Sequence, residues 1–152
     1  MAFIFQKVGR GRAEMFKILK NGSSSAIVPG DAVVYDYTTA ADGISVILPT
    51  TALLEAFAGL VAEGTTLAAS GTDGQYGKVQ IYGHHAAARY AVGESIAAGQ
   101  PMVPANATGA MALGVTDATT ANPHIQFAFS GESVTRARSL YSTPKVAFLR
   151  TM

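Results

Sequence analysis

The sequence contains no cysteine and little charge. Without thiols the chain can form neither a disulfide framework nor a thiolate metal site, so we expect no redox function, and synthesis in a reducing cytoplasm fits. Charged residues make up 14% of the chain, against about a quarter of a typical soluble domain. This low charge predicts that part of the apolar surface is buried against other chains.

Long apolar runs are also missing. The N-terminal residues lack the apolar stretch of a secretory signal, and no segment approaches the ~18 uninterrupted apolar residues of a membrane-spanning helix. We therefore expect neither export nor membrane insertion. A net charge of +1 is too balanced for a dedicated nucleic-acid-binding protein, and 152 residues suffice for one domain with its own core.

The charges that are present are segregated along the chain. Nine of the eleven Lys and Arg residues lie in the first 20 and last 17 positions: Lys7, Arg10, Arg12, Lys17, Lys20, Arg136, Arg138, Lys145 and Arg150. Between residues 25 and 131, two basic residues stand against eight acidic ones, a net charge of −6. Oppositely charged ends and body favour a subunit that attaches itself to a neighbouring protein over a monomeric enzyme.

Turn residues divide the chain into short apolar segments. The 16 Gly and six Pro residues, together with abundant Thr and Ala, predict an all-β fold. Residues 50–58 and 132–141 have spacing that fits either a short helix or a loop. We expect a basic N-terminal arm over 1–24, a β domain over 25–131 and a C-terminal linker and strand over 132–152. Strands are predicted at 15–19, 32–37, 44–48, 57–62, 78–82, 101–103, 110–115, 125–129 and 145–149.

Alternation within residues 78–82 predicts which side chains face the core. Val79 and Ile81 are expected to point inward, and Lys78, Gln80 and Tyr82 toward solvent or a partner.

The sequence also contains an internal similarity. Residues 27–34 (IVPGDAVV) align with 96–103 (IAAGQPMV), and a glycine-led segment follows each copy, at 42–46 and 108–112. The alignment continues with 59–63 against 114–118, and with 78–82 against 124–127. It predicts two related β-meander halves in one small barrel or sandwich, with extended N- and C-terminal arms. Chance similarity between glycine-rich turns is the alternative.

Residues that could carry catalysis or bind a metal are scattered. Adjacent residues on a strand face opposite ways, so His84 and His85 cannot easily ligate one metal ion, and no carboxylate cluster lies at ligand spacing. Asp31, Asp42 and Asp73 each adjoin a glycine, as turn residues do. No nucleophile elbow or phosphate-binding loop is present, and residues 9–12 (GRGR) indicate a flexible basic arm. We expect no catalytic residue, cofactor or metal.

Six segments together resemble a known family. They are 27–34, 42–49 (DGISVILP), 57–63 (FAGLVAE), 77–83 (GKVQIYG), 96–100 (IAAGQ) and 146–152 (VAFLRTM). In this order they are similar to the head decoration, or cement, proteins of tailed bacteriophages. The resemblance covers residues 25–115 and, more loosely, the C-terminal strand. The long basic N-terminal segment and the Arg-containing segment before the last strand depart from the family pattern.

The resemblance implies a structural virion protein, made in the host cytoplasm, that binds the outside of the expanded head and stabilises it. Such proteins are commonly homotrimers whose partner is the major capsid protein. We therefore expect the nine terminal basic residues to contact the capsid while the apolar body self-associates. Removing residues 1–20 should abolish capsid binding and leave a folded body.

Two other functions stay open. A carbohydrate- or host-binding module, such as a head fibre or adhesin, could present Tyr82, His84, His85 and Tyr90 as a surface patch. A small β-barrel hydrolase would need a pocket with paired polar groups.

Overall fold

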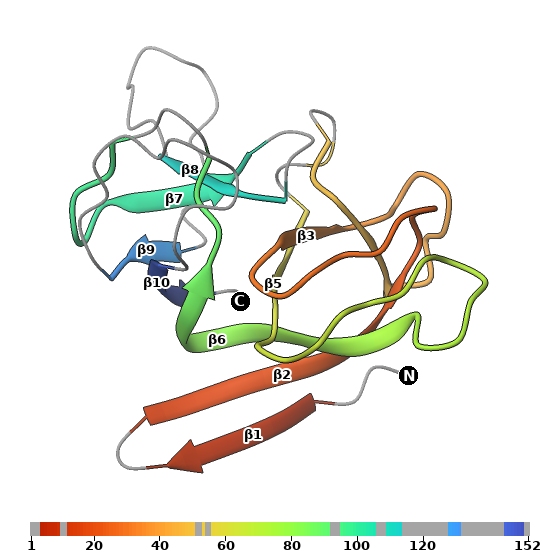
Figure 1. Cartoon of the computed structure of the whole chain (residues 1–152), viewed down its shortest axis with the longest axis horizontal. Helices are drawn as coiled ribbons and strands as arrows, with labels where there is room; N and C mark the ends of the chain where they lie inside the picture. The colour runs from red at the N-terminus through yellow and green to blue at the C-terminus, as the bar shows by residue number, and fades with distance from the viewer. Residues whose placement is uncertain are drawn as a thin grey trace.

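The computed structural model shows an all-β protein, as the sequence predicts (Figure 1). It describes residues 4–9, 12–50, 53, 56–91, 95–105, 109–113, 128–131 and 145–150, without the side chains of 5–9, 12, 113, 145–148 and 150. In these residues there is no α-helix. The strands are β1 (Ile4–Gly9), β2 (Arg12–Asn21), β3 (Ala32–Tyr35), β4 (Ser45–Ile47), β5 (Phe57–Val61), β6 (Tyr76–Ala88), β7 (Pro101–Pro104), β8 (Met111–Leu113), β9 (Ala128–Ser130) and β10 (Lys145–Arg150).

All nine predicted strands overlap observed ones, and β1 was not expected. The segment 132–141, expected as a helix or linker, lies outside the described residues, as does much of 50–58.

Five strands form a closed ring, which we call the first ring. β2 pairs with β4, β4 with β3, β3 with β5, β5 with β6, and β6 again with β2. Alternate side chains of these strands point inward and meet in one apolar cluster. Its members are Leu19, Ile27, Val33, Val46, Ala58, Val61, Leu67 and Val79, all buried.

A second ring continues from the same strand. β6 pairs with β10, β10 with β9, β9 with β7 and β7 with β8, and a bridge from Tyr90 to Met111 joins the chain after β6 to β8. Its core is formed by Ala32, Phe57, Leu60, Ala88, Tyr90, Ile96, Met102, Met111, Ala128 and Leu149. Ala32, Phe57 and Leu60 belong to β3 and β5. These two strands are therefore buried on both faces, as their unbroken apolar sequences suggest.

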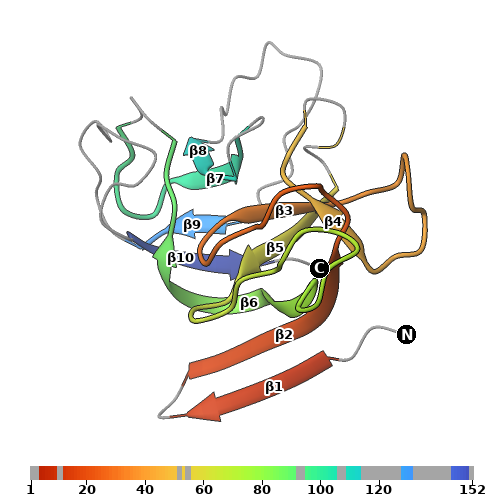
Figure 2. The same ribbon diagram turned by 45° about the vertical axis from the view of Figure 1, so that its right-hand side comes forward.

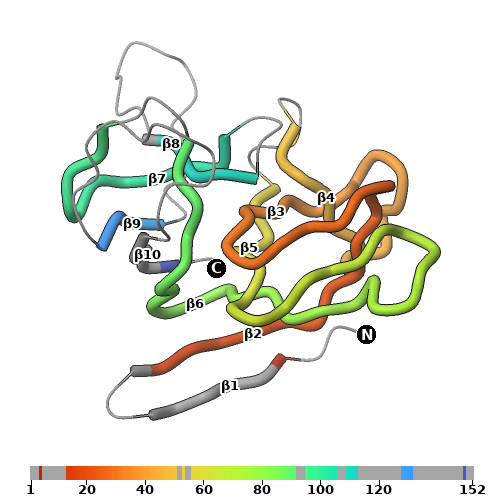
Figure 3. The backbone as a smooth tube through the Cα atoms, viewed as in Figure 1, coloured from red at the N-terminus to blue at the C-terminus, as the bar shows by residue number. Residues whose placement is uncertain are grey.

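The strand shared by both rings is β6, with 13 residues. Its first half pairs with β2 and its second half with β10 (Figure 1). Figure 3 shows β6 running along β2 and then bending away from it. A register shift opposite Met15 and Phe16, followed by Gly83 at a φ of 98°, marks the change between the two halves. A Cβ at Gly83 would lie 2.3 Å from the carbonyl oxygen of Ala13, so only glycine lets β2 pass this closely.

The aligned turns make the same backbone contacts in both rings. The Gly30 N–H donates to the Val61 carbonyl at 2.9 Å, and the Gly99 N–H donates to the Ser130 carbonyl at 2.7 Å. Both glycines have positive φ, 82° and 80°. In the first turn the Asp31 carboxylate accepts the Val28 N–H at 3.1 Å. In the second turn the Gln100 side chain accepts the Ala97 N–H at 2.7 Å. The similarity between 27–34 and 96–103 thus corresponds to equivalent turns.

The later part of the sequence alignment was wrong. The counterpart of β5 is β9 rather than 114–118, because β9 pairs with β7 and β10 as β5 pairs with β3 and β6. The counterpart of the first half of β6 is then β10, not 124–127. More residues separate β8 from β9 than β4 from β5, so a linear alignment loses register there. Residues 114–127 lie outside the described residues.

The N-terminal segment is a β-hairpin in its described part. β1 and β2 pair antiparallel from Ile4 with Lys17 to Gly9 with Arg12. Figures 1 and 2 both show this hairpin along the outer side of β6. Leu19 and Asn21 of β2 are fully buried. Residues 12–21 are therefore part of the sheet and core, and removing residues 1–20 would open the first ring.

The alternation expected in 78–82 holds for Val79 and Ile81 but was wrong for Gln80, which is buried. Gln80 pairs with Leu60 of β5, and the Leu60 side chain packs in the core of the second ring. The face of β6 that carries the Gln80 side chain is therefore covered by the second ring. The Gln80 amide donates to the carbonyls of Tyr82 and His84, at 3.2 and 3.0 Å, which satisfies the buried group.

Candidate interaction surface

Five of the nine basic residues of the chain ends lie on β2 and β10, the strands that flank β6. Tyr82 pairs with Met15 of β2 on one edge and with Arg150 of β10 on the other. The backbones of Arg12, Lys17 and Lys20 thus lie on one side of β6. The backbones of Lys145 and Arg150 lie on the other side, and that of Lys7 lies on the adjoining β1. Arg10, Arg136 and Arg138 fall outside the described residues. The fold therefore brings the two basic ends to the same strand.

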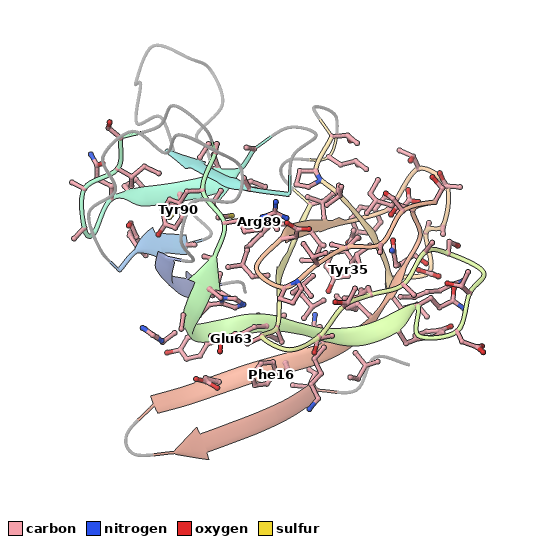
Figure 4. All side chains as sticks on the ribbon, in the orientation of Figure 1. Phe16, Tyr35, Glu63, Arg89 and Tyr90 are labelled. Atoms are coloured by element: carbon pink, nitrogen blue, oxygen red, sulfur yellow. The ribbon has the colours of Figure 1, made fainter. Side chains whose placement is uncertain are left out.

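The outer face of β2 and β6 combines apolar and basic side chains. Cross-strand pairs place Ile18 opposite Lys78 and Lys20 opposite Tyr76. Phe16, labelled in Figure 4, and Ile18 are half-buried, while Tyr76 is 53% exposed. Side chains opposite each other in an antiparallel pair share a face. This face offers aromatic and aliphatic area beside ammonium groups, the composition of many protein interfaces.

A second group of side chains lies at one end of the first ring. Lys17 pairs with Val79, which belongs to the ring's inner cluster, so the Lys17 side chain is on the inner face of β2. Its Nζ donates to the Tyr35 hydroxyl at 3.0 Å and lies 5.6 Å from the Tyr35 ring centroid. The Tyr37 ring centroid is 5.8 Å from that of Tyr35. Tyr37 is 55% exposed, so the group reaches the surface.

The two adjacent histidines face opposite ways, as expected on a strand. His84 is half-buried, whereas His85 is 1% exposed. The His85 Nδ1 accepts the Ala87 N–H at 3.1 Å, so its Nε2 carries the proton and donates to the Val61 carbonyl at 2.9 Å. Burial lowers the pKa of His85, an effect opposed by the Val61 hydrogen bond and by the charge of Glu63. His85 is therefore a neutral structural residue.

The surface patch considered for glycan binding was wrong in composition. His85 and Tyr90 are both buried, and the Tyr90 hydroxyl lies 3.1 Å from the Ser130 hydroxyl inside the second ring. Tyr82 and His84 alone remain accessible from the expected four.

A largely buried ion pair joins the two rings. Arg89, just after β6, pairs with Asp31 in the first repeated turn, and Figure 4 shows Arg89 between the two groups of strands. A Cβ at Gly109 would lie 2.8 Å from the Asp31 carboxyl carbon, so Gly109 packs directly on it. Burial raises the pKa of Asp31, while the Val28 N–H and the charge of Arg89 act in the opposite direction. Sequence reasoning placed Asp31 in a turn and missed the pair, although Arg89 is one of only two basic residues between 25 and 131.

Two further carboxylates, Asp42 and Asp36, cap their own backbone, as predicted for Asp42. Asp42 Oδ1 accepts the N–H groups of Ile44 and Ser45, at 2.9 and 2.7 Å, and these hydrogen bonds lower its pKa to about 2. Asp36 accepts the N–H groups of Thr38 and Thr39 in the same way, and its pKa is also lowered, chiefly by the Thr39 bond. These carboxylates hold turns in shape.

In the described ranges, no group of three or more His, Asp or Glu side chains is placed to hold a metal ion. No helix in that part of the chain is long and apolar enough to cross a membrane. Comparison with known protein families, with curated proteins and with solved structures gives no match to this chain.

Proposed function

We propose that this chain is a structural virion protein that binds the outer surface of a tailed-phage capsid and stabilises the head. The convergence of both basic chain ends on β6 supports this proposal most directly. Attachment by two separate arms would give two weak contacts, whereas basic residues brought to neighbouring strands can contribute to one contact region. Lys beside aromatic side chains suits an acidic surface on the major capsid protein.

The proposal includes the architecture and assembly of the body. The two rings of strand pairings are two small barrels that share β6, and copies of the chain form a homotrimer on the head. Exposed apolar side chains are available for contacts between copies, among them Val28 and Tyr82. A body held together by two apolar cores, one of them shared between the rings, would resist outward force without relying on disulfides.

We also propose that the protein has no catalytic role. Three of the polar groups that the sequence singled out have structural tasks: His85 bonds a carbonyl, Asp42 holds a turn and Asp31 joins the rings. We propose no cofactor, no nucleic-acid contact and no membrane contact. The mature protein resides on the virion after synthesis in the host cytoplasm.

Binding of the purified chain to expanded heads at rising salt tests the proposal. If the basic face docks on an acidic capsid surface, occupancy at 0.5 M NaCl should fall severalfold relative to 0.05 M, because the Debye length shrinks from more than about 10 Å to less than about 5 Å. Bovine serum albumin serves as a control for non-specific adsorption. Absence of saturable binding at low salt would contradict the proposal.

A further inference from the structure

Lys17 is a cation held in place without an acidic partner in the described residues. The ion pair found there joins Arg89 to Asp31, and no carboxylate lies within 4 Å of the Lys17 Nζ. Its hydrogen bond to Tyr35 uses one of the three ammonium donors. The Tyr35 hydroxyl accepts that bond, so its own proton remains available. An ammonium and a phenol 3.0 Å apart can therefore both donate to one anion placed between them.

The second ring shows that building a ring does not require this arrangement. His85 pairs with Ala147 as Lys17 pairs with Val79, and Pro104 pairs with Met111 as Tyr35 pairs with Val46. At the counterpart of Lys17, the polar group is buried and bonded to the Val61 carbonyl. At the counterpart of Tyr35 there is no hydroxyl. Within the described residues, only the first ring has hydrogen-bond donors without an acceptor at this position.

The surroundings indicate what kind of anion fits. Ile4 lies opposite Lys17 on β1 and is 57% exposed, and the Tyr37 ring lies beside the Tyr35 ring. Apolar area beside each of the two donors favours an anion carried by a polypeptide over a free, hydrated ion. The hairpin also carries Lys7, Arg12 and Lys20 against a single acidic residue, Glu14, so its charge complements an acidic segment.

We infer that Lys17 and Tyr35 form a carboxylate-binding site for an Asp or Glu side chain of a partner protein, bordered by Ile4 and Tyr37. On the proposed function, on which this assignment to a partner rests, the carboxylate belongs to the capsid surface. The site would fix the position of the chain on that surface, while the other basic residues supply general attraction.

Two short peptides test the site without a capsid. Acetyl-Leu-Glu-Leu-amide should shift the NMR signals of Lys17, Tyr35 and Tyr37 in the full chain and saturate, whereas acetyl-Leu-Gln-Leu-amide should not. Lys17→Met and Tyr35→Phe should each weaken binding of the Glu peptide at least tenfold. Each variant removes a hydrogen bond to a charged group, worth about 1.5–3 kcal/mol, and about 1.4 kcal/mol corresponds to tenfold in affinity. Lys78→Met removes an exposed ammonium from β6, away from Tyr35, and should leave binding of the peptide unchanged.

Equal responses to the Glu and Gln peptides in the wild-type chain would overturn the site, whether or not the variants fold. NMR shifts at these residues with a neutral oligosaccharide, but not with the Glu peptide, would also overturn the site. That result would indicate glycan binding instead. Head binding separates this inference from the proposed function. If Lys17→Met loses the peptide but binds heads normally, the assignment to the capsid is overturned. If neither peptide binds while the wild-type chain binds heads, the carboxylate-binding site is overturned and the proposed function is not.

Discussion

At the residue scale, the junction between the rings depends on a few tightly packed groups. A Cβ at Gly30 would lie 1.9 Å from the Ala87 carbonyl oxygen, and the Gly30 carbonyl accepts the Arg89 N–H at 3.2 Å. The Asp31–Arg89 pair lies directly beside this contact. Removing one partner of a buried ion pair commonly costs about 3–5 kcal/mol because the other charge is left unpaired. An ion pair and a backbone hydrogen bond thus hold the junction, in addition to apolar contact.

The buried His85 predicts a loss of stability in mild acid. Its folded-state pKa is below the ordinary value of 6.5, so between these two values the unfolded chain binds the proton and the folded chain does not. The free energy of unfolding should therefore fall as the pH drops below about 6.5, by up to about 1.4 kcal/mol per pH unit from this group. Urea denaturation at pH 7 and pH 5 measures the change.

The variant His85→Gln isolates this contribution. Its amide can still donate to the Val61 carbonyl but does not titrate, so its stability should change less between pH 7 and pH 5 than that of the wild type. Identical pH dependence in the two proteins would show that His85 does not become charged on unfolding in the way described.

At the element scale, the N-terminal hairpin has two distinct parts. β2 closes the first ring through β4 and β6, whereas β1 pairs with β2 alone in the described chain. Sequence reasoning identified the basic residues of this segment but treated it as an arm. The reason is that residues 12–20 combine Lys and Arg with apolar residues, and only the partner strands reveal that Leu19 points into a core.

Leu19→Ala should therefore destabilise the protein by about 2–5 kcal/mol, as truncation of a buried leucine usually does. Ile18→Ala, on the outer face of the same strand, should cost about 1 kcal/mol, because Ile18 is only half-buried. Deleting residues 1–9, which removes β1 but keeps β2, should leave a cooperative unfolding transition. Chemical denaturation of the three variants measures this order, and a mild effect of Leu19→Ala would show that β2 is not part of the core.

At the scale of the whole molecule, the sequence predicted the fold class and the first repeated turns. Local signals were enough there, because Gly30 and Gly99 both need positive φ and both start a strand. The sharing of β6 between two rings was not predictable, since strand pairing is set by partners distant in the chain. For the same reason the burial of Gln80 and the meeting of both basic ends at β6 were missed.

The candidate site, too, was predictable only in part from local sequence signals. Lys17 was singled out from the sequence as one of nine basic residues. Its partners Tyr35 and Tyr37 were not, because they lie on or just after β3 and meet Lys17 only when the ring closes. The available signal was that Lys17 lies two residues before Leu19 on the same strand. This spacing puts both side chains on the inward face.

We propose that the chain is a structural part of a phage head. Quantitative mass spectrometry of purified virions from the phage that encodes it, combined with electron cryomicroscopy of the heads, tests this proposal most directly. We expect the chain in a fixed ratio to the major capsid protein, on the outer capsid surface, with the β1–β2 hairpin toward the shell. Virions that contain no copy of the chain, or copies only on the tail, would contradict it.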